Sequence, residues 1–225
     1  MAYPTVAGPY GLQPINLVGG QVYAGQVRQI PIASGSSTDI FYGDVVKINT
    51  DGTIVKDTGT TTATPVGIFM GCTYTNPSTS QKLTYQSYTA NTNAPDIQAY
   101  VVDDPDVLFK VAAVSSGTTV AFYSSQQVGL NAALVQNNGN GTTGDSQVAI
   151  DGTSFATTAS LPIRVVDIVP DTAITSTATL VSGGGTTTLT TSVLTSALPF
   201  GTEVLYLAAN GQLIATGSWV AAAVT

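Results

Sequence analysis

The stretch GDVVKINTDGTIVKDTGTTTATPVGIFMG, residues 43–71, decides the fold of this chain. A β-branched run over 44–48 meets an Asp-Gly pair at 51–52, and a second run follows over 53–56. Asp-Gly between two such runs is a strong hairpin signal, because glycine accepts the positive φ that tight turns require. A threonine-rich loop then leads to a third run, 65–70. The stretch therefore predicts a compact β-meander.

The composition of the chain also favours an all-β fold. Its 225 residues are enough to bury a substantial core in one large domain or two small ones. Only 8% of the residues are charged, and Glu203 is the one glutamate. Threonine suits a pleated, half-exposed strand whereas glutamate suits a helix, so few helical residues are expected. We predict short antiparallel strands arranged as a barrel or a sandwich-like core.

Strand-like runs and turn signals continue along the rest of the chain. The predicted strands occupy residues 81–88, 97–102, 107–111, 118–123 and 161–169, and the last of them is apolar enough to be buried. Residues 129–135 are compatible with a single helical turn, and the Asn- and Gly-rich stretch 137–144 predicts a loop. Further on, the glycines at 183–185 separate two threonine-rich strands, and Asn210-Gly211 predicts a tight hairpin.

The first 38 residues differ from the rest of the chain. Prolines recur there among glycines and tyrosines, and proline fixes φ and lacks a ladder donor, so an extended segment is expected. The segment is either a terminal strand packed on its own domain or an arm that adds main-chain hydrogen bonds to a partner's sheet edge. The predicted organisation is an N-terminal arm over 1–38, a β-rich core over 39–171 and a C-terminal β region over 172–225. The last region either belongs to the core domain or stands apart, with Trp219 as a core anchor.

The charge of the chain argues against one class of partner. Its net charge is −7, and its six cationic residues are spread along the sequence. Nucleic-acid binding relies on clustered lysine and arginine, so no nucleic-acid partner is expected. No apolar run approaches the length of a membrane-spanning helix, and no signal-peptide pattern is visible. We therefore expect no membrane partner and synthesis in the cytoplasm.

The residue types that common catalytic and metal sites require are scarce. The chain has no histidine, which removes Ser-His-Asp and Cys-His catalysis and most zinc sites. Its single cysteine, Cys72, cannot form an intrachain disulfide and has no imidazole partner, so a buried, unreactive thiol is expected. We predict no catalytic residues, no cofactor and no resident metal.

The acidic cluster of Asp103, Asp104 and Asp106 allows more than one interpretation. A glycosidase needs two opposed carboxylates, and a calcium site needs roughly six or more converging oxygens. Aspartates beside a proline in a strand connection more often bond their own backbone amides. We therefore predict a turn at this cluster, with a bound cation as the main alternative.

Several segments carry a family resemblance when they are read in order. PYGLQP at 9–14 looks like an opening common among phage structural proteins, and YGDVVK at 42–47 is similar to the start of a small β-tulip core. The other matching segments are 51–52, 65–69, 99–105, 108–109, 128–132 and 161–167. Together these segments resemble the capsid decoration, or cement, proteins of tailed bacteriophages. Residues 173–199 cannot be aligned with that family, so their role stays open.

The resemblance implies a β-tulip core and a structural function without enzymatic activity. Such proteins bind the outside of an icosahedral shell, commonly as homotrimers, and hold neighbouring major capsid subunits together. The implied partners are the major capsid protein and other copies of this chain, and the implied location is the capsid exterior. The residues expected to contact the shell are Tyr3, Tyr10, Leu12, Ile15, Leu17 and Tyr23.

Two other functions belong to different classes of virion protein. A receptor- or carbohydrate-binding module would present exposed aromatic side chains, and the ten tyrosines of this chain are not clustered in sequence. A major capsid subunit is disfavoured, because such subunits need a long helix. The carbohydrate- or receptor-binding module therefore remains the main alternative to the decoration protein.

Overall fold

The computed structural model describes residues 8–121, 123 and 125–169, together with the backbone of four later strands, 176–182, 185–191, 203–207 and 213–218. The chain divides into two compact units, Met1–Ile168 and Val169–Thr225. In the described residues the regular structure is β-strand apart from one 3-10 turn, η1 (Ser125–Gln127), so the all-β prediction is confirmed. The sheets of these residues are open, and none of them closes into a barrel.

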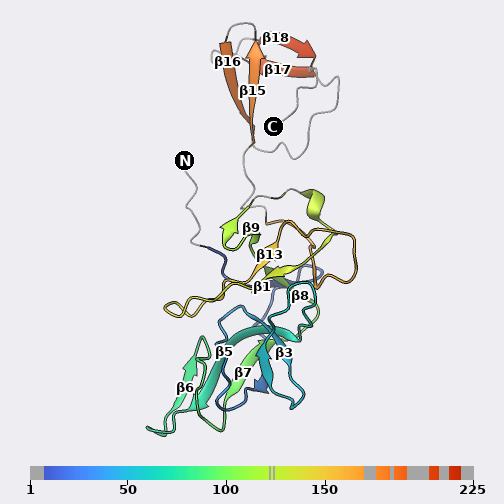
Figure 1. The fold of residues 1–225 in the computed structure, drawn as a ribbon. Helices are drawn as coiled ribbons and strands as arrows, with labels where there is room; N and C mark the ends of the chain where they lie inside the picture. Colours follow the sequence, from blue (N-terminus) through green and yellow to red (C-terminus); the bar gives the residue numbers. More distant parts are fainter. Residues whose placement is uncertain are drawn as a thin grey trace. The chain divides into compact units, whose positions relative to one another are not determined.

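The largest sheet of the first unit has six strands (Figure 1). Five of them follow the spatial order β2 (Arg28–Pro31), β7 (Gln98–Val102), β5 (Gly67–Thr75), β3 (Val45–Ile48) and β4 (Ile54–Lys56). The sixth strand, β6 (Lys82–Tyr85), pairs with β5 outside that path. All pairings in the sheet are antiparallel. The long strand β5 pairs with three other strands and therefore holds the sheet together.

The stretch 43–71 forms the three predicted strands but not the predicted meander. β3 pairs with both β4 and β5, so the first strand lies between the other two. A meander would instead place β4 in the middle. The adjacent residues Val45 and Val46 are both fully buried, and neighbours on a strand point to opposite faces. Burial on both faces makes β3 a central strand and leaves β4 at the edge.

Two apolar clusters cover the two faces of this sheet. One cluster contains Val46 and Phe69, and the other contains Val45 and Ile68. Because these residues are sequence neighbours on β3 and β5, the two clusters lie on opposite faces. The second cluster is completed by residues that are far away in the sequence, Leu12, Leu134 and Val148. Long-range packing therefore connects the sheet to both the N-terminal segment and the later loops.

Smaller sheets complete the first unit (Figure 1). β1 (Gln13–Leu17) pairs with β8 (Val107–Lys110), and β11 (Asn131–Ala132) pairs with β14 (Ile163–Arg164). A four-stranded sheet has the order β10 (Thr119–Val120), β9 (Ala113–Ser116), β13 (Ala149–Asp151) and β12 (Leu134–Val135). Its β9–β13 pair is parallel. Strands β9 and β13 were not predicted, because their short runs carry no strong alternation.

The second unit contains the two predicted C-terminal hairpins. β15 (Ser176–Ser182) pairs with β16 (Gly185–Thr191), and β17 (Glu203–Leu207) pairs with β18 (Leu213–Ser218). Both pairings are antiparallel and agree with the turn signals of the sequence. Trp219, predicted as a core anchor, lies outside the described residues.

One local prediction was wrong, and one conformation that the sequence left open does not occur. The buried strand expected over 161–169 is reduced to the two residues of β14, and Arg164 and Val166 are exposed. Its pairing partner is the two-residue strand β11, which covers too little of the run to bury it. Residues 129–135 contain strands β11 and β12 instead of a helical turn.

The N-terminal segment is largely built into the first unit. β1 pairs with β8 and β2 with β7, as the alternative of a terminal strand packed on its own domain describes. Ile30 and Ile32 are buried in the first apolar cluster. The first unit therefore combines the predicted arm with the predicted core, and it ends at Ile168 where the sequence suggested residue 171. Contact between this segment and a partner stays a prediction.

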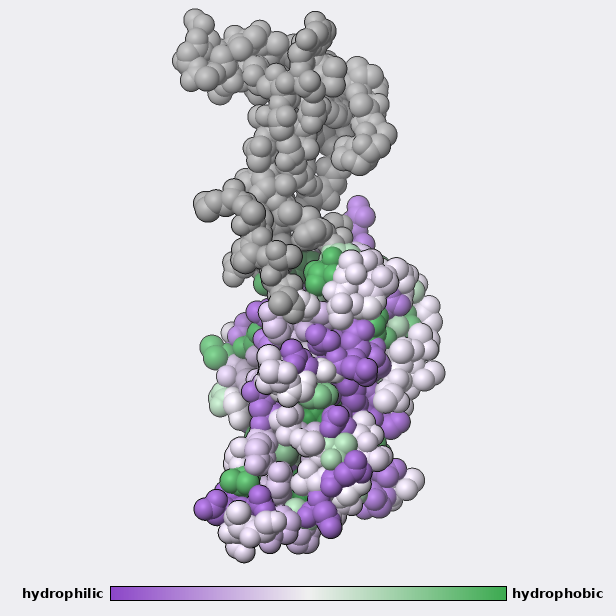
Figure 2. Space-filling model, turned by 60° about the vertical axis from the view of Figure 1, so that its left-hand side comes forward, coloured by the Kyte–Doolittle hydropathy of each residue, from purple (hydrophilic) through white to green (hydrophobic). Residues whose placement is uncertain are grey.

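The surface of the first unit is polar without being strongly charged. Figure 2 shows apolar residues as small separate patches among polar residues and residues of intermediate hydropathy. This distribution agrees with a composition in which 8% of the residues are charged. The solubility of this surface therefore depends on uncharged polar side chains.

Candidate binding site

The structure divides the predicted contact residues between the core and the surface. Tyr3 lies outside the described residues. Leu12 is 4% exposed and packs in the second apolar cluster, so, contrary to the prediction, it is not available to a partner. Tyr10 and Ile15 are each 42% exposed, whereas Leu17 and Tyr23 are half-buried. The exposed members therefore mark two separate features, a loop and a cavity.

Residues 15–27, which we call the N-terminal loop, present apolar side chains to solvent. Val18 is 59% exposed and Val22 is 78% exposed. A hydrogen bond of 2.8 Å from Leu17 N to Gln21 O closes the tip of the loop. Four of the ten exposed large hydrophobic side chains of the described residues belong to this loop. Val18 N also donates a hydrogen bond of 2.7 Å to Asp106 O, so main-chain hydrogen bonds shape this exposed apolar segment.

Specific contacts also fix the two ends of the N-terminal loop. The register between β1 and β8 shifts between Pro14 and Asn16, which makes Ile15 a bulge residue. A bulge re-aims the side chain of the extra residue, and that of Ile15 is exposed. The Tyr23 hydroxyl donates a hydrogen bond of 2.7 Å to Gln26 O. The loop is therefore an ordered element that can present its apolar side chains.

The two segments that introduce the family resemblance, PYGLQP and YGDVVK, meet in the structure. Leu12 N donates a hydrogen bond of 2.9 Å to Gly43 O. Gly11 has a φ of +72°, and a Cβ at this position would lie 2.6 Å from both Gly43 O and Ser146 Cβ. Only glycine fits such a conformation at such a distance. On either side of this close approach, Leu12 lies in the core and Tyr10 lies at the surface.

Asp44 is fully buried beside this contact, and both of its carboxylate oxygens have partners. Oδ1 accepts a hydrogen bond of 2.6 Å from Ser146 Oγ and lies 3.1 Å from Lys56 Nζ. Oδ2 accepts a hydrogen bond of 2.9 Å from Phe41 N. The charge of Asp44 is therefore paired, and we call these groups the Asp44 junction. The junction fastens β3, β4 and the segment around Ser146 together.

A half-enclosed cavity of about 230 Å³ lies next to the Asp44 junction. Its lining residues are Pro9, Tyr10, Asn140, Thr143, Asp145, Ser146 and Gln147. They combine an aromatic ring, a proline, a carboxylate, and several hydroxyl and amide groups, and no lysine or arginine is among them. This cavity is smaller and more polar than most small-molecule sites, whose lining is predominantly apolar. We call it the Tyr10 cavity.

The polar wall of the Tyr10 cavity, residues 140–147, is held in place by its own hydrogen bonds. Asn140 N donates to Asp145 O at 2.8 Å, and Asn140 Oδ1 accepts from Thr142 N at 2.9 Å. Gln86 Nε2 donates to Asp145 Oδ1 at 2.7 Å. The side chain of Asp145 is therefore oriented before any ligand arrives.

Sequence reasoning found Tyr10 but missed the opposite wall of the cavity. Residues 137–144 were predicted only as a loop, and Asp145 was not singled out. The structure places the charge of Asp145 close to Tyr42, whose pKa is raised by burial and, secondarily, by that charge. No local signal links Asp145 to Tyr10, because the two lie at distant positions in the sequence.

The acidic cluster forms the predicted turn. Asp104 Oδ1 accepts a hydrogen bond of 2.9 Å from Asp106 N, and Val107 N donates to Asp104 O at 3.2 Å. Asp103 instead lies 2.7 Å from the guanidinium of Arg28 and thereby ties β2 to the end of β7. In the part of the chain that the structure describes, no three His, Cys, Asp or Glu side chains group as metal ligands.

Cys72 and a pair of stacked tyrosines lie on β5 and β6. Cys72 is buried, as predicted, and burial raises the pKa of its thiol to about 11.

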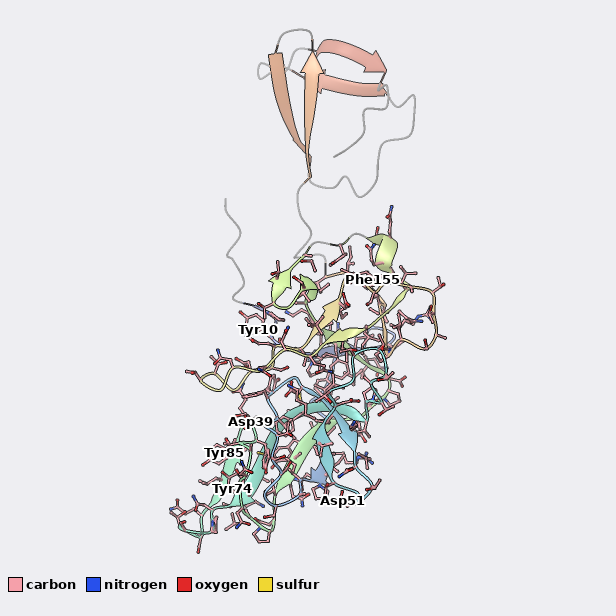
Figure 3. All side chains as sticks on the ribbon, viewed as in Figure 1. Tyr10, Asp39, Asp51, Tyr74, Tyr85 and Phe155 are labelled. Carbon is pink, nitrogen blue, oxygen red and sulfur yellow. The ribbon has the colours of Figure 1, made fainter. Side chains whose placement is uncertain are left out.

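Tyr74 and Tyr85 stack with ring centroids 5.3 Å apart, and Figure 3 shows them side by side. Since they lie on paired strands, their main effect is to stabilise the β5–β6 hairpin. Tyr10 is labelled at a separate place in the same figure.

Comparisons with protein-family models, with curated proteins and with solved structures found no match to this chain. Among the described residues, no helix is long and apolar enough to cross a membrane.

Proposed function

We propose that this chain is a structural virion protein that binds the outer surface of a tailed-phage capsid and stabilises neighbouring major capsid subunits. The observation that carries the proposal is the N-terminal loop, an ordered segment that exposes Ile15, Val18, Val22 and Val27. Apolar side chains gathered on one exposed segment are typical of surfaces that bind another protein. The major capsid protein is the proposed partner.

The scaffold supports this use of the loop. β1 contains the first three residues of the loop and pairs with β8, and β2 directly follows the loop and pairs with β7, so both ends of the loop are anchored in sheets. The segments PYGLQP and YGDVVK also form one contact close to the start of β1. A rigid base with an exposed apolar segment suits a clamp between shell subunits.

The proposal extends to assembly and location. We propose a homotrimer on the capsid exterior, made in the host cytoplasm and without enzymatic activity. Three copies of the N-terminal loop in one assembly would let individually modest contacts hold firmly. The net charge of −7 suits an exterior position better than contact with packaged DNA.

The test uses virions of the phage that encodes this chain. Gold-labelled antibodies against the purified protein are expected to decorate the outside of intact capsids and not the tails. Virions that lack the gene are expected to release their DNA at a lower temperature than wild-type virions. Label confined to tails, or label absent from intact virions, would contradict the proposal.

A matched pair of variants tests the role of the loop. Val18→Ser, Val22→Ser and Val27→Ser together are expected to abolish rebinding to shells that lack the protein. The control replaces three other exposed valines, Val120, Val128 and Val166, with serine. The control variant is expected to rebind normally, because these side chains are exposed elsewhere on the first unit. Equal rebinding by both variants would remove the loop from the proposed attachment.

A further inference from the structure

We infer that the Tyr10 cavity binds one saccharide unit, the terminal sugar of a glycan. The lining of the cavity supports this inference independently of the proposed capsid function. The cavity has a volume of about 230 Å³, which suits one sugar ring better than a chain of several rings.

The polar groups of the cavity match sugar hydroxyls. Asp145 accepts hydrogen bonds only, whereas Asn140, Thr143 and Gln147 can both donate and accept. Each hydroxyl of a sugar also donates and accepts. A saccharide can therefore satisfy both kinds of group at once.

The opposite wall supplies an apolar face. Tyr10 is 42% exposed at the cavity, and Pro9 lies buried beside it. An exposed tyrosine has a flat apolar ring with a polar tip. The C–H face of a pyranose can pack on this ring while its hydroxyls reach the polar wall.

The site is organised before binding. Gln86 orients the carboxylate of Asp145, and the close approach of Gly11 to Gly43 fixes the backbone beside Tyr10. In the described residues no hydrogen bond reaches Asp145 Oδ2, which leaves this oxygen for a ligand hydroxyl. Groups that are held in place lose little entropy when a ligand binds.

A basic side chain is the competing ligand, because none of the ion pairs in the described residues includes Asp145. An ammonium or guanidinium group can only donate hydrogen bonds, so it would leave the amide donors of Asn140 and Gln147 unmatched. Asp145 also offers one unbonded oxygen where a bidentate guanidinium prefers two. The lining therefore favours a neutral polyol.

The experiment titrates the full chain with methyl glycosides of glucose, galactose, mannose and N-acetylglucosamine, observed through backbone amide NMR shifts. At least one glycoside is expected to shift the amides of Tyr10, Gly144, Asp145 and Gln147, with a Kd on the order of 1 mM. Tyr10→Ala and Asp145→Asn are each expected to weaken this binding about tenfold or more.

Two control variants show whether the loss is local. Tyr85→Ala removes a tyrosine with the same 42% exposure, and Asp106→Asn removes an exposed carboxylate outside the cavity. Both are expected to bind the glycoside as the wild type does. Equal weakening in the controls, or no shift with any of the four glycosides at about 10 mM, ten times the expected Kd, would overturn the inference. Shifts of the cavity amides with Nα-acetyl-arginine amide and none with glycosides would also overturn it, in favour of a basic side chain.

Discussion

The Asp44 junction and the Tyr10 cavity meet at the neighbouring residues Asp145 and Ser146. Each contains one aspartate, and the two carboxylates differ in burial and in the number of their bonding partners. Asp44 is buried, and it is bonded to a lysine, a hydroxyl and a backbone amide. Asp145 is half-buried, and within the part of the chain that the structure describes its carboxylate receives one hydrogen bond, from the neutral side chain of Gln86. A buried charge has to be fully paired to be tolerated, whereas a charge at a cavity can keep unused bonding capacity.

This difference predicts which substitutions lower the stability of the first unit and which alter ligand binding. The Asp44 junction fastens β3, β4 and the 140–147 segment, so changes there are expected to unfold the first unit. The backbone hydrogen bond from Asn140 N to Asp145 O does not involve the Asp145 carboxylate, so a change confined to that carboxylate is expected to alter binding alone. The following predictions test this separation in order of decreasing effect.

The largest effect is expected for Lys56→Met, which leaves the charge of Asp44 buried without its cation. Lys56 is 9% exposed and Asp44 is fully buried. Breaking such a pair is expected to lower the free energy of unfolding by about 3–5 kcal/mol, measured by urea denaturation. The control is Arg28→Met, since Arg28 is 53% exposed and lies 2.7 Å from Asp103, whose side chain is 28% exposed. Its expected cost is about 1 kcal/mol or less, and equal losses in both variants would contradict the comparison.

The next effect is expected for Gly11→Ala, compared with Gly20→Ala. Both glycines have positive φ, so alanine pays a left-handed backbone cost of about 1–2 kcal/mol at either position. At Gly11 the new Cβ also meets Gly43 and Ser146, which adds about 1–3 kcal/mol, whereas nothing lies within 4 Å at Gly20. The melting temperature of Gly11→Ala, measured by thermal unfolding, should therefore lie well below that of Gly20→Ala. Equal melting temperatures would show that the contact with Gly43 relaxes freely.

A small effect on stability is expected for Asp145→Asn. The side chain keeps an acceptor for Gln86, and the wall keeps its backbone bonds. The free energy of unfolding should change by no more than about 0.5 kcal/mol. A loss as large as that of Lys56→Met would show that Asp145 belongs to the folding core and not to a binding wall.

The smallest effect concerns an exposed carboxylate, Asp96, which accepts hydrogen bonds of 2.7 Å and 2.9 Å from Thr75 Oγ1 and N. These two hydrogen bonds lower the pKa of Asp96 below 3.8, and the bond from the Thr75 hydroxyl contributes more than the bond from the amide. A pKa lowered by folding adds stability above the unfolded value, and this is lost as the pH falls through the folded value. Thr75→Val should raise the pKa of Asp96 towards 3.8 in a carboxyl NMR titration.

Asp51 provides the internal reference for that titration. Its pKa is lowered mainly by the hydroxyl and amide of Thr53, which both donate to Asp51 Oδ1, whereas the two Thr75 donors bond different oxygens of Asp96. Its pKa should stay low in Thr75→Val. A parallel rise at both aspartates would indicate a general change in the fold instead of the loss of one hydroxyl.

Much of the secondary structure could be predicted, because it depends on a few neighbouring residues. The turn at Asp51-Gly52 appears where the sequence placed it, and strands β17 and β18, which precede and follow Asn210-Gly211, pair as predicted. The burial of Cys72 was also predicted. The two-residue strands β11 and β14 were not, because they exist only through pairing with each other.

The candidate site was less predictable for the same reason. Tyr10 could be singled out as an aromatic residue in a distinctive segment, but the partners that make it part of a cavity come from 140–147. Leu12 was expected at the surface and lies in the core, since the contact of Gly11 with Gly43 directs the chain inward.

The sequence alone determined the all-β class, the acidic and weakly charged surface, and the positions of the main turns. These properties follow from composition and from the φ preferences of single residues. Only the tertiary structure decided that β3 lies between β4 and β5, that Leu12 is buried, and that Asp44 is paired while Asp145 faces a cavity. Strand order and burial depend on which distant surfaces pack together, and local sequence does not encode that choice.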